Sequence, residues 1–115
     1  MKIFYPIPPQ CLDKTRLLTE LERIMQVHDN ISSGNFSDPE TSRWATYLPA
    51  LYDRYQKSRD YLNEHYQSNY PDHWIHEPLR QGAECLYPEI PQDEVLDMWG
   101  ELLMSDLVLE YSLKT

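Results

Sequence analysis

A long helical pattern between residues 38 and 66 limits the folds open to this chain more than any other part of its sequence. Asp38 is a favourable N-cap, and Pro39 suits the first helical position, where a backbone N–H has no intrahelical partner. Apolar side chains then recur at helical spacing; they are Trp44, Leu48, Leu51, Tyr55, Leu62 and Tyr66. The pattern predicts a long central helix with one face in a hydrophobic core.

The other face of this stretch is charged. Its residues are Arg43, Asp53, Arg54, Lys57, Arg59 and Asp60, and we expect them on a solvated surface. Pro49 lacks the N–H that a helix interior needs, and it also restricts the residue before it. A kink or a break in the helix is therefore expected just before Pro49.

Two elements are expected ahead of the central helix. Residues 2–5 lead into a run of prolines, which favours an extended arm over a strand. A first helix is expected from about Leu12 to His28, because its apolar residues share one face. A loop rich in Asn, Ser and Gly should follow from Asp29 to Ser37.

Charged side chains on the first helix have regular spacing. Glu20 lies four residues after Arg16 and three before Arg23. These are the spacings of surface ion pairs on a helix, each contributing about 0.2–0.5 kcal/mol. We expect all three side chains on the solvated flank of this helix.

The chain beyond the central helix has a weaker pattern. We expect a loop at residues 67–78, a short helix at 79–86, irregular chain at 87–91 and a last helix from Gln92 to Tyr111. Acidic residues suit the N-terminus of this last helix. Its apolar residues spread over more than one stripe, so the helix is either buried on several sides or also makes a dimer contact.

Together these elements predict an all-α fold, a compact single-domain helical bundle over residues 1–115 with an extended N-terminal arm. No apolar run approaches the roughly 18 residues of a membrane span. The N-terminus has no apolar run of signal-peptide length, so we expect a cytoplasmic protein. Cys11 and Cys85 are then expected as buried thiols, not as a disulfide.

Charge is distributed unevenly along the chain. Residues 1–60 contain eight Lys and Arg against eight Asp and Glu, whereas residues 61–115 contain two against eleven, so the second half carries the whole net charge of −9. Because Lys and Arg contacts to phosphate dominate affinity for nucleic acids, any DNA surface must lie on the first half. The second half instead suggests a partner with a basic surface.

Few residues have the spacing of a catalytic or metal-binding motif. His65, His73 and His76 with Glu77 could in principle form a zinc site and support a metal-dependent hydrolase. However, the histidines lack helical i, i+4 spacing, and no cysteine pair accompanies them. We therefore predict no metal and no cofactor. The sequence also lacks a nucleophile elbow and a Gly-rich phosphate loop.

Three stretches between Met1 and Tyr66 carry a recognisable pattern. They are MKIFYPIPPQCLDKTRLLTELER, DPETSRW and YLPALYDRYQKSRDYLNEHY. They resemble, in turn, the N-terminal arm and first helix, a segment often written with His-Pro, and the long central helix of the phage-type pyrimidine-dimer DNA glycosylases and their bacterial relatives. Asp38 stands where that segment usually has histidine.

This resemblance implies a compact all-α DNA-repair enzyme without cofactors. Such an enzyme breaks the glycosidic bond of a damaged pyrimidine and then cleaves the abasic strand, after flipping a base out of the duplex. The nucleophile is the N-terminal amine, here that of Met1, which titrates near 8 and can attack a sugar carbon when neutral. An essential glutamate lies on the first helix, and its position aligns with Arg23.

The resemblance thus points to three catalytic candidates and one DNA surface. Met1 would be the nucleophile, and Glu20 or Glu22 would be the acid–base partner by position. The basic residues that would contact the phosphates of damaged or abasic DNA are Lys2, Arg16, Arg23, Arg43, Arg54, Lys57 and Arg59.

A second hypothesis keeps the fold without the chemistry. In this alternative the acidic second half binds a basic DNA-binding protein, as a DNA mimic or inhibitor, because carboxylates spaced along a helix can imitate phosphates. The acids that would form this surface are Asp93, Glu94, Asp97, Glu101, Asp106 and Glu110.

Overall fold

The computed structural model describes residues 3–70 and 86–102, which form helices joined by loops, with no strand among them. The elements are the 3-10 helix η1 (Pro9–Cys11) and the α-helices α1 (Lys14–Ser33), α2 (Pro39–Trp44), α3 (Leu48–His65) and α5 (Gln92–Leu102). The predicted compact all-α fold is confirmed.

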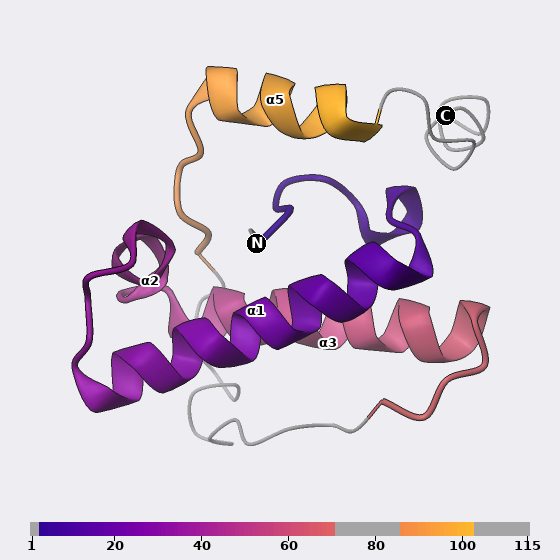
Figure 1. The fold of residues 1–115 in the computed structure, drawn as a ribbon, viewed down its shortest axis with the longest axis horizontal. Helices are drawn as coiled ribbons and strands as arrows, with labels where there is room; N and C mark the ends of the chain where they lie inside the picture. The colour runs from indigo at the N-terminus through magenta and orange to yellow at the C-terminus, as the bar shows by residue number, and fades with distance from the viewer. Residues whose placement is uncertain (1–2, 71–85, 103–115) are drawn as a thin grey trace.

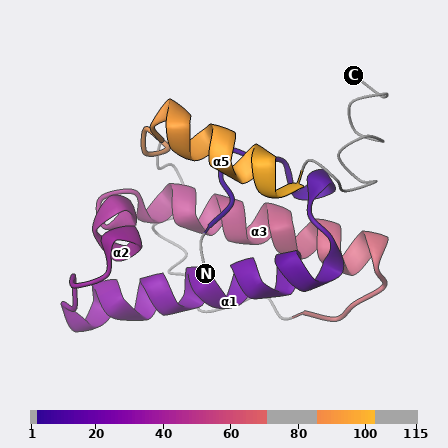
Figure 2. The ribbon, with the colours of Figure 1, turned by 45° about the horizontal axis from the view of Figure 1, so that its top comes forward.

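Helices α1 and α3 lie side by side in opposite directions and form the centre of the fold, with α2 at one end (Figure 1). The N-terminal arm, residues 3–8, runs between this pair and α5 (Figure 2). The core is built from these elements; its largest fully buried apolar side chains are Ile3, Ile7, Leu12, Leu17, Leu21, Ile24, Trp44, Leu51, Tyr55, Leu62 and Leu102.

The arm is fastened by apolar burial and by aromatic contacts. Ile3 and Ile7 are buried. The ring of Tyr5 stacks on that of Tyr87 at a centroid distance of 4.3 Å and meets the edge of Trp44 at 5.9 Å. Stacked and edge-to-face aromatic pairs of this kind add stability beyond the burial of their surface. The predicted arm is therefore a packed part of the fold.

Helix α1 is longer than the sequence predicted. It begins after Asp13, whose carboxylate accepts the Arg16 N–H at 2.8 Å as an N-cap. It continues to Ser33, so the expected loop from residue 29 was wrong over its first five residues. Ile31 packs against the core, which holds this extra turn in place. Gly34 then ends the helix with a φ of 76°, a conformation that glycine adopts at little cost.

The predicted break in the central helix is confirmed. Asp38 caps α2 by accepting the Glu40 N–H at 3.0 Å. Residues 45–47 then separate α2 from α3, and Pro49 occupies the first turn of α3, where its missing N–H removes no helical hydrogen bond. The break turns α2 away from α3 and carries it towards α5 (Figure 1).

Several predictions fall wholly or partly outside the described residues. These are most of the short helix at 79–86, the end of the last helix at 103–111, and Cys85. Cys11 is a free, buried thiol, as predicted, and burial raises its pKa. No helix among the described residues has the length and apolar character to cross a bilayer. The single-domain organisation of residues 1–115 stays a prediction.

Candidate functional site

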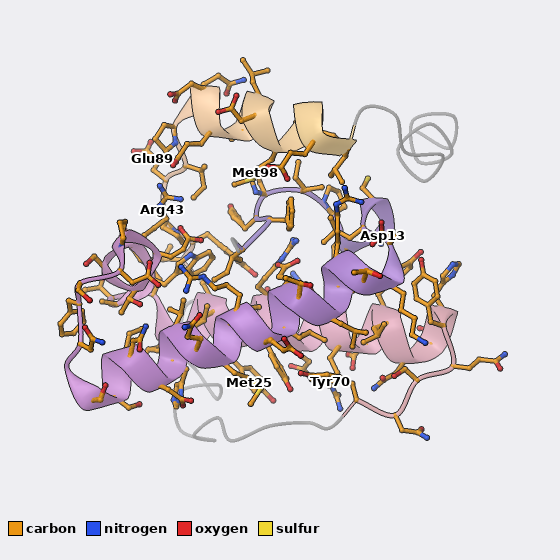
Figure 3. All side chains as sticks on the ribbon, viewed as in Figure 1. Asp13, Met25, Arg43, Tyr70, Glu89 and Met98 are labelled. Atoms are coloured by element: carbon orange, nitrogen blue, oxygen red, sulfur yellow. The ribbon has the colours of Figure 1, made fainter. Side chains whose placement is uncertain are left out.

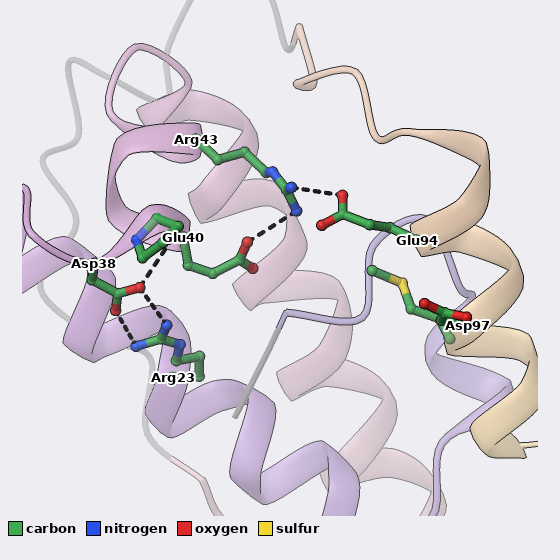
Figure 4. Close-up of a pocket in the computed structure, with 8 residues that line it drawn as sticks. Arg23, Asp38, Glu40, Arg43, Glu94 and Asp97 are labelled. Atoms are coloured by element: carbon green, nitrogen blue, oxygen red, sulfur yellow. Dashed lines mark hydrogen bonds and ion pairs between the residues drawn. The ribbon is translucent and has the colours of Figure 1, made fainter.

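A pocket of about 320 Å³ lies where α1, the start of α2 and α5 approach one another. Charged side chains dominate its walls (Figure 4). Its lining residues are Arg23, Asp38, Pro39, Glu40, Arg43, Glu94, Asp97 and Met98. The pocket thus combines two guanidinium groups with four carboxylates contributed by three different helical segments.

Arg23 and Asp38 form the wall of the pocket between α1 and α2. Arg23 Nη1 lies 2.6 Å from Asp38 Oδ2, and Nη2 donates to Oδ1 at 2.9 Å. Nη1 also donates to Gln26 Oε1 at 2.8 Å. The hydrogen bond from Arg23 is the main reason that the pKa of Asp38 is lowered, because it stabilises the ionised carboxylate. This pair joins Arg23, which aligns with the family's essential glutamate, to Asp38, which begins the segment often written with His-Pro.

Arg43 connects α2 to α5 across the pocket. Its Nη1 donates to Glu40 Oε1 at 3.0 Å, and its Nη2 donates to Glu94 Oε2 at 2.6 Å (Figure 4). The second oxygen of Glu40 accepts the backbone N–H of Ile3 at 3.2 Å. Glu40 therefore holds the start of the N-terminal arm at the wall of the pocket.

Glu20 and Arg54 lie in the core, away from this pocket. The Glu20 side chain is 0% exposed and that of Arg54 is 6% exposed. Arg54 Nε donates to Oε1 at 2.6 Å and Nη2 donates to Oε2 at 3.2 Å, which joins α1 to α3 by a two-pronged contact. The expected solvated position of Arg54 and the expected surface pairs of Glu20 were wrong, because the two charges satisfy each other inside the fold.

Glu22, another catalytic candidate, does not line the pocket. Glu22 is exposed on α1. Its charge acts on Tyr70, whose pKa is raised mainly by burial and secondarily by Glu22. Tyr70 lies on the side of α1 opposite Arg43 (Figure 3), and Glu22 is not among the residues that line the pocket. Met1 is outside the described residues.

The basic residues predicted to contact DNA do not form one surface. Lys2 is outside the described residues, and only Arg23 and Arg43 line the pocket. Each of the six described bases has a carboxylate partner; the three contacts not yet described are Arg16–Asp13 at 2.6 Å, Lys57–Asp53 at 2.9 Å and Arg59–Asp60 at 2.8 Å. These pairs neutralise much of the positive charge that a phosphate would need.

The acids predicted to bind a basic partner are partly arranged on one face. Asp93, Asp97 and Glu101 are exposed and recur every four residues along α5, so they lie on one side of the helix. Glu94 and Asp97 both line the pocket, and Glu94 pairs with Arg43. Asp106 and Glu110 lie outside the described residues.

The histidines of the metal hypothesis gain no support from the described part of the chain. The His65 ring is stacked on Tyr61 at a centroid distance of 5.0 Å. His73, His76 and Glu77 lie outside the described residues. Within residues 3–70 and 86–102, no group of His, Cys, Asp and Glu side chains has the arrangement of a metal site.

Sequence reasoning did not identify Glu40 as a site residue. Glu40 reads as an ordinary acid in the first turn of a helix, and its contact with Ile3 spans 37 positions in the chain. No local pattern links two such residues. The available signal was its place directly after Asp38 and Pro39, in a segment that resembles the family.

The comparison with protein families agrees with this resemblance. The family model for pyrimidine dimer DNA glycosylase matches residues 1–73, which include the arm, α1, α2 and α3. No curated protein and no solved structure matches the chain. The matched segment is more than half of the 115 residues. The chain therefore belongs to the pyrimidine dimer DNA glycosylase family, which is a DNA-repair family.

Proposed function

We propose that this chain is a DNA-repair protein that cleaves DNA at abasic sites, with the amine of Met1 as its nucleophile. The observation that carries the proposal is the hydrogen bond from the Ile3 N–H to Glu40 at the pocket wall. Met1 lies two residues before Ile3 in the sequence, and two extended residues span at most about 7 Å. Covalent geometry therefore keeps the Met1 amine within reach of the pocket.

The chemistry suits an abasic sugar better than an intact nucleotide. An abasic deoxyribose opens to an aldehyde, and a neutral amine can attack this carbon and lose water to give an imine. An intact nucleotide must first lose its base, and the resemblance implies an essential glutamate on the first helix. Arg23 occupies that aligned position and is bound to Asp38. The lyase step is therefore the part of the family activity that we assign to this chain.

The pocket has the features that such a step needs near its amine. Arg23 and Arg43 line it and offer guanidinium groups to an incoming phosphate, although each must exchange a carboxylate for it. The carboxylates of Asp38, Glu40, Glu94 and Asp97 are fixed on several sides of the same cavity. A cation such as a protonated imine would be stabilised by this surplus of negative charge.

Borohydride trapping tests the proposal directly. The chain beginning at Met1 is mixed with duplex DNA containing one abasic site and with sodium borohydride at low salt, where phosphate contacts are strongest. We expect a covalent protein–DNA adduct whose peptide map places the DNA on Met1.

The matched control is the same chain extended by several residues before Met1. Extension keeps every lysine but moves the terminal amine away from the pocket, so the adduct should be lost. Absence of an adduct with the unextended chain, or an adduct mapped to a lysine, would overturn the proposal.

A second candidate function is the non-catalytic acidic interaction protein. It is favoured by the carboxylate partners of the six described bases that were predicted to contact DNA, and by the exposed row of Asp93, Asp97 and Glu101 on α5. The partner that binds this acidic surface would be a basic DNA-binding protein, and the chain would compete with DNA for that protein. In a competition assay, wild-type chain should release DNA from such a protein, and a folded chain with Asp97→Lys and Glu101→Lys should not. Equal competition by both chains would reject this candidate.

A further inference from the structure

We propose that Glu40 is the catalytic carboxylate of this site, the group that removes a proton from the abasic sugar after the imine has formed. The assignment rests on the proposed lyase function. It places the acid–base residue at the start of α2, away from α1, where the aligned position of the family's essential glutamate is Arg23.

Glu40 is held in one orientation beside the N-terminal arm. Its side chain is 12% exposed. One oxygen accepts from Arg43 at 3.0 Å, and the other accepts the Ile3 N–H at 3.2 Å. Each carboxylate oxygen can accept more than one hydrogen bond, so these contacts orient Glu40 without using all its acceptor capacity. The result is a positioned carboxylate bound to the backbone of Ile3, the residue two positions after the proposed nucleophile.

The other acidic residues of the first two helices are less suited to this role. Glu20 is sealed in the core by Arg54 and has no exposed surface. Glu22 is exposed and is not among the residues that line the pocket. Asp38 is bound through both oxygens by Arg23, and its pKa is lowered, which makes it a weaker base.

The two pocket acids on α5, Glu94 and Asp97, are linked less directly to the start of the arm than Glu40 is. Glu94 binds Arg43, and Asp97 stands beyond it on the same helix (Figure 4). Neither has a hydrogen bond to the backbone of the arm among those found in the described residues, whereas Glu40 does. Both also follow residue 73, where the family match ends.

The proposed step balances without a further reactant. The Met1 amine and the C1′ aldehyde have already formed a protonated imine with release of water. Glu40 takes the proton from C2′, the C–H electron pair becomes the C2′=C3′ double bond, and the C3′–O bond breaks. The 3′ phosphate leaves as an anion, and water later hydrolyses the imine and accepts the proton from Glu40. The protonated imine acts as the electron sink that makes C2′ acidic.

The test separates imine formation from strand cleavage. Glu40→Gln retains an oxygen that can accept the Ile3 N–H but cannot act as the base. We expect this variant to form the borohydride-trapped adduct within about threefold of the wild-type yield, while single-turnover strand cleavage falls about 100-fold or more, the range typical of a lost general base. Glu64→Gln, at an exposed position of α3, is the matched control, and its cleavage rate should equal that of the wild type.

The possible outcomes distinguish the assignment from the function on which it rests. An adduct with the wild type, together with wild-type cleavage by Glu40→Gln, overturns the role of Glu40 and leaves the lyase standing. If the wild type forms no adduct, both the lyase function and the role of Glu40 are rejected. If thermal unfolding shows that Glu40→Gln is not folded, Glu40→Asp is used, which keeps the charge but withdraws it by one methylene. A folded Glu40→Asp chain with normal adduct yield must cleave more slowly than the wild type, and an unchanged rate rejects the assignment.

Discussion

Two ion pairs begin within one turn of each other on α1, but one is buried in the core and the other lies at a pocket wall. Glu20 is paired with Arg54 in the core, where neither side chain meets appreciable solvent. Arg23, three residues later, is paired with Asp38 at the wall of an open pocket. The same two chemical groups are therefore used once as a sealed contact between helices and once as part of an accessible cavity.

The difference in exposure decides which of the two ion pairs a ligand can reach. A sealed pair cannot accept a ligand without unfolding its surroundings, and the removal of one partner leaves a buried charge without compensation. A pair at a pocket wall can exchange its carboxylate for another anion, because water and ligand both reach it. Sequence spacing alone treats Glu20 and Arg23 as equivalent members of one charged flank.

The largest effect should come from breaking the sealed pair. Arg54→Met leaves the Glu20 carboxylate buried without its partner, so the free energy of unfolding at pH 7 should fall by about 3–5 kcal/mol. Urea denaturation followed by circular dichroism measures this change. A loss below about 1 kcal/mol, the value of an exposed pair, would show that the contact is not sealed.

Its control is the double variant Glu20→Met and Arg54→Met. Two apolar side chains of similar length fill the same space and leave no charge, so most of the lost stability should return. A double variant as unstable as Arg54→Met would instead indicate that packing, not charge, is the dominant contribution of Arg54.

A smaller, pH-dependent effect is expected at the pocket wall. Asp38→Asn keeps an N-cap for α2 but removes the ion pair with Arg23, and should cost about 1–2 kcal/mol at pH 7. The pKa of folded Asp38 lies below its ordinary value of 3.8. Its stabilising contribution is therefore complete above that value and is lost as the pH falls through the lower folded pKa.

The measurement compares urea unfolding of the wild type and Asp38→Asn at pH 7 and at successively lower pH. The difference between the two chains should shrink under acid conditions. Asp60→Asn is the matched control, because the Asp60 side chain is 55% exposed and its loss should change stability by less than about 0.5 kcal/mol. A difference that grows towards low pH contradicts the ion pair.

The smallest effect should come from the exposed pair on α3. The Lys57 side chain is 65% exposed, and its partner Asp53 also accepts a hydrogen bond from the Tyr87 hydroxyl. Lys57→Met should therefore change the free energy of unfolding by no more than about 0.5 kcal/mol. A larger loss, measured at low salt and abolished by added salt, would place Lys57 in a stronger network than its exposure indicates.

Much of the fold followed from local sequence signals. The N-cap at Asp38, the break before Pro49 and the apolar face of the central stretch depend on neighbouring residues, and all three were predicted. The end of α1 was missed, because Asn30, Ser32 and Ser33 favour loops by composition, while Ile31 gains burial only in the folded chain. Tertiary packing overrode the local preference.

The site was less predictable than the fold. Glu20 with Arg54 and Glu40 with Ile3 are contacts between residues 34 and 37 positions apart, and helical periodicity carries no information about such separations. Arg54 was assigned to solvent for this reason. The family resemblance identified the arm and the first helix as the important region, but not which acids face the pocket.

The sealed Glu20–Arg54 pair also has a consequence for how this sequence can change over generations. Because each side chain neutralises the other in the core, a single substitution at either position creates an unstable protein, whereas a simultaneous change of both need not. Descent by single steps therefore tends to retain the pair, whatever the chain does at its pocket. A lineage could exchange the residues of the pocket, and with them its activity, while this contact between α1 and α3 persists as a record of shared ancestry in the fold.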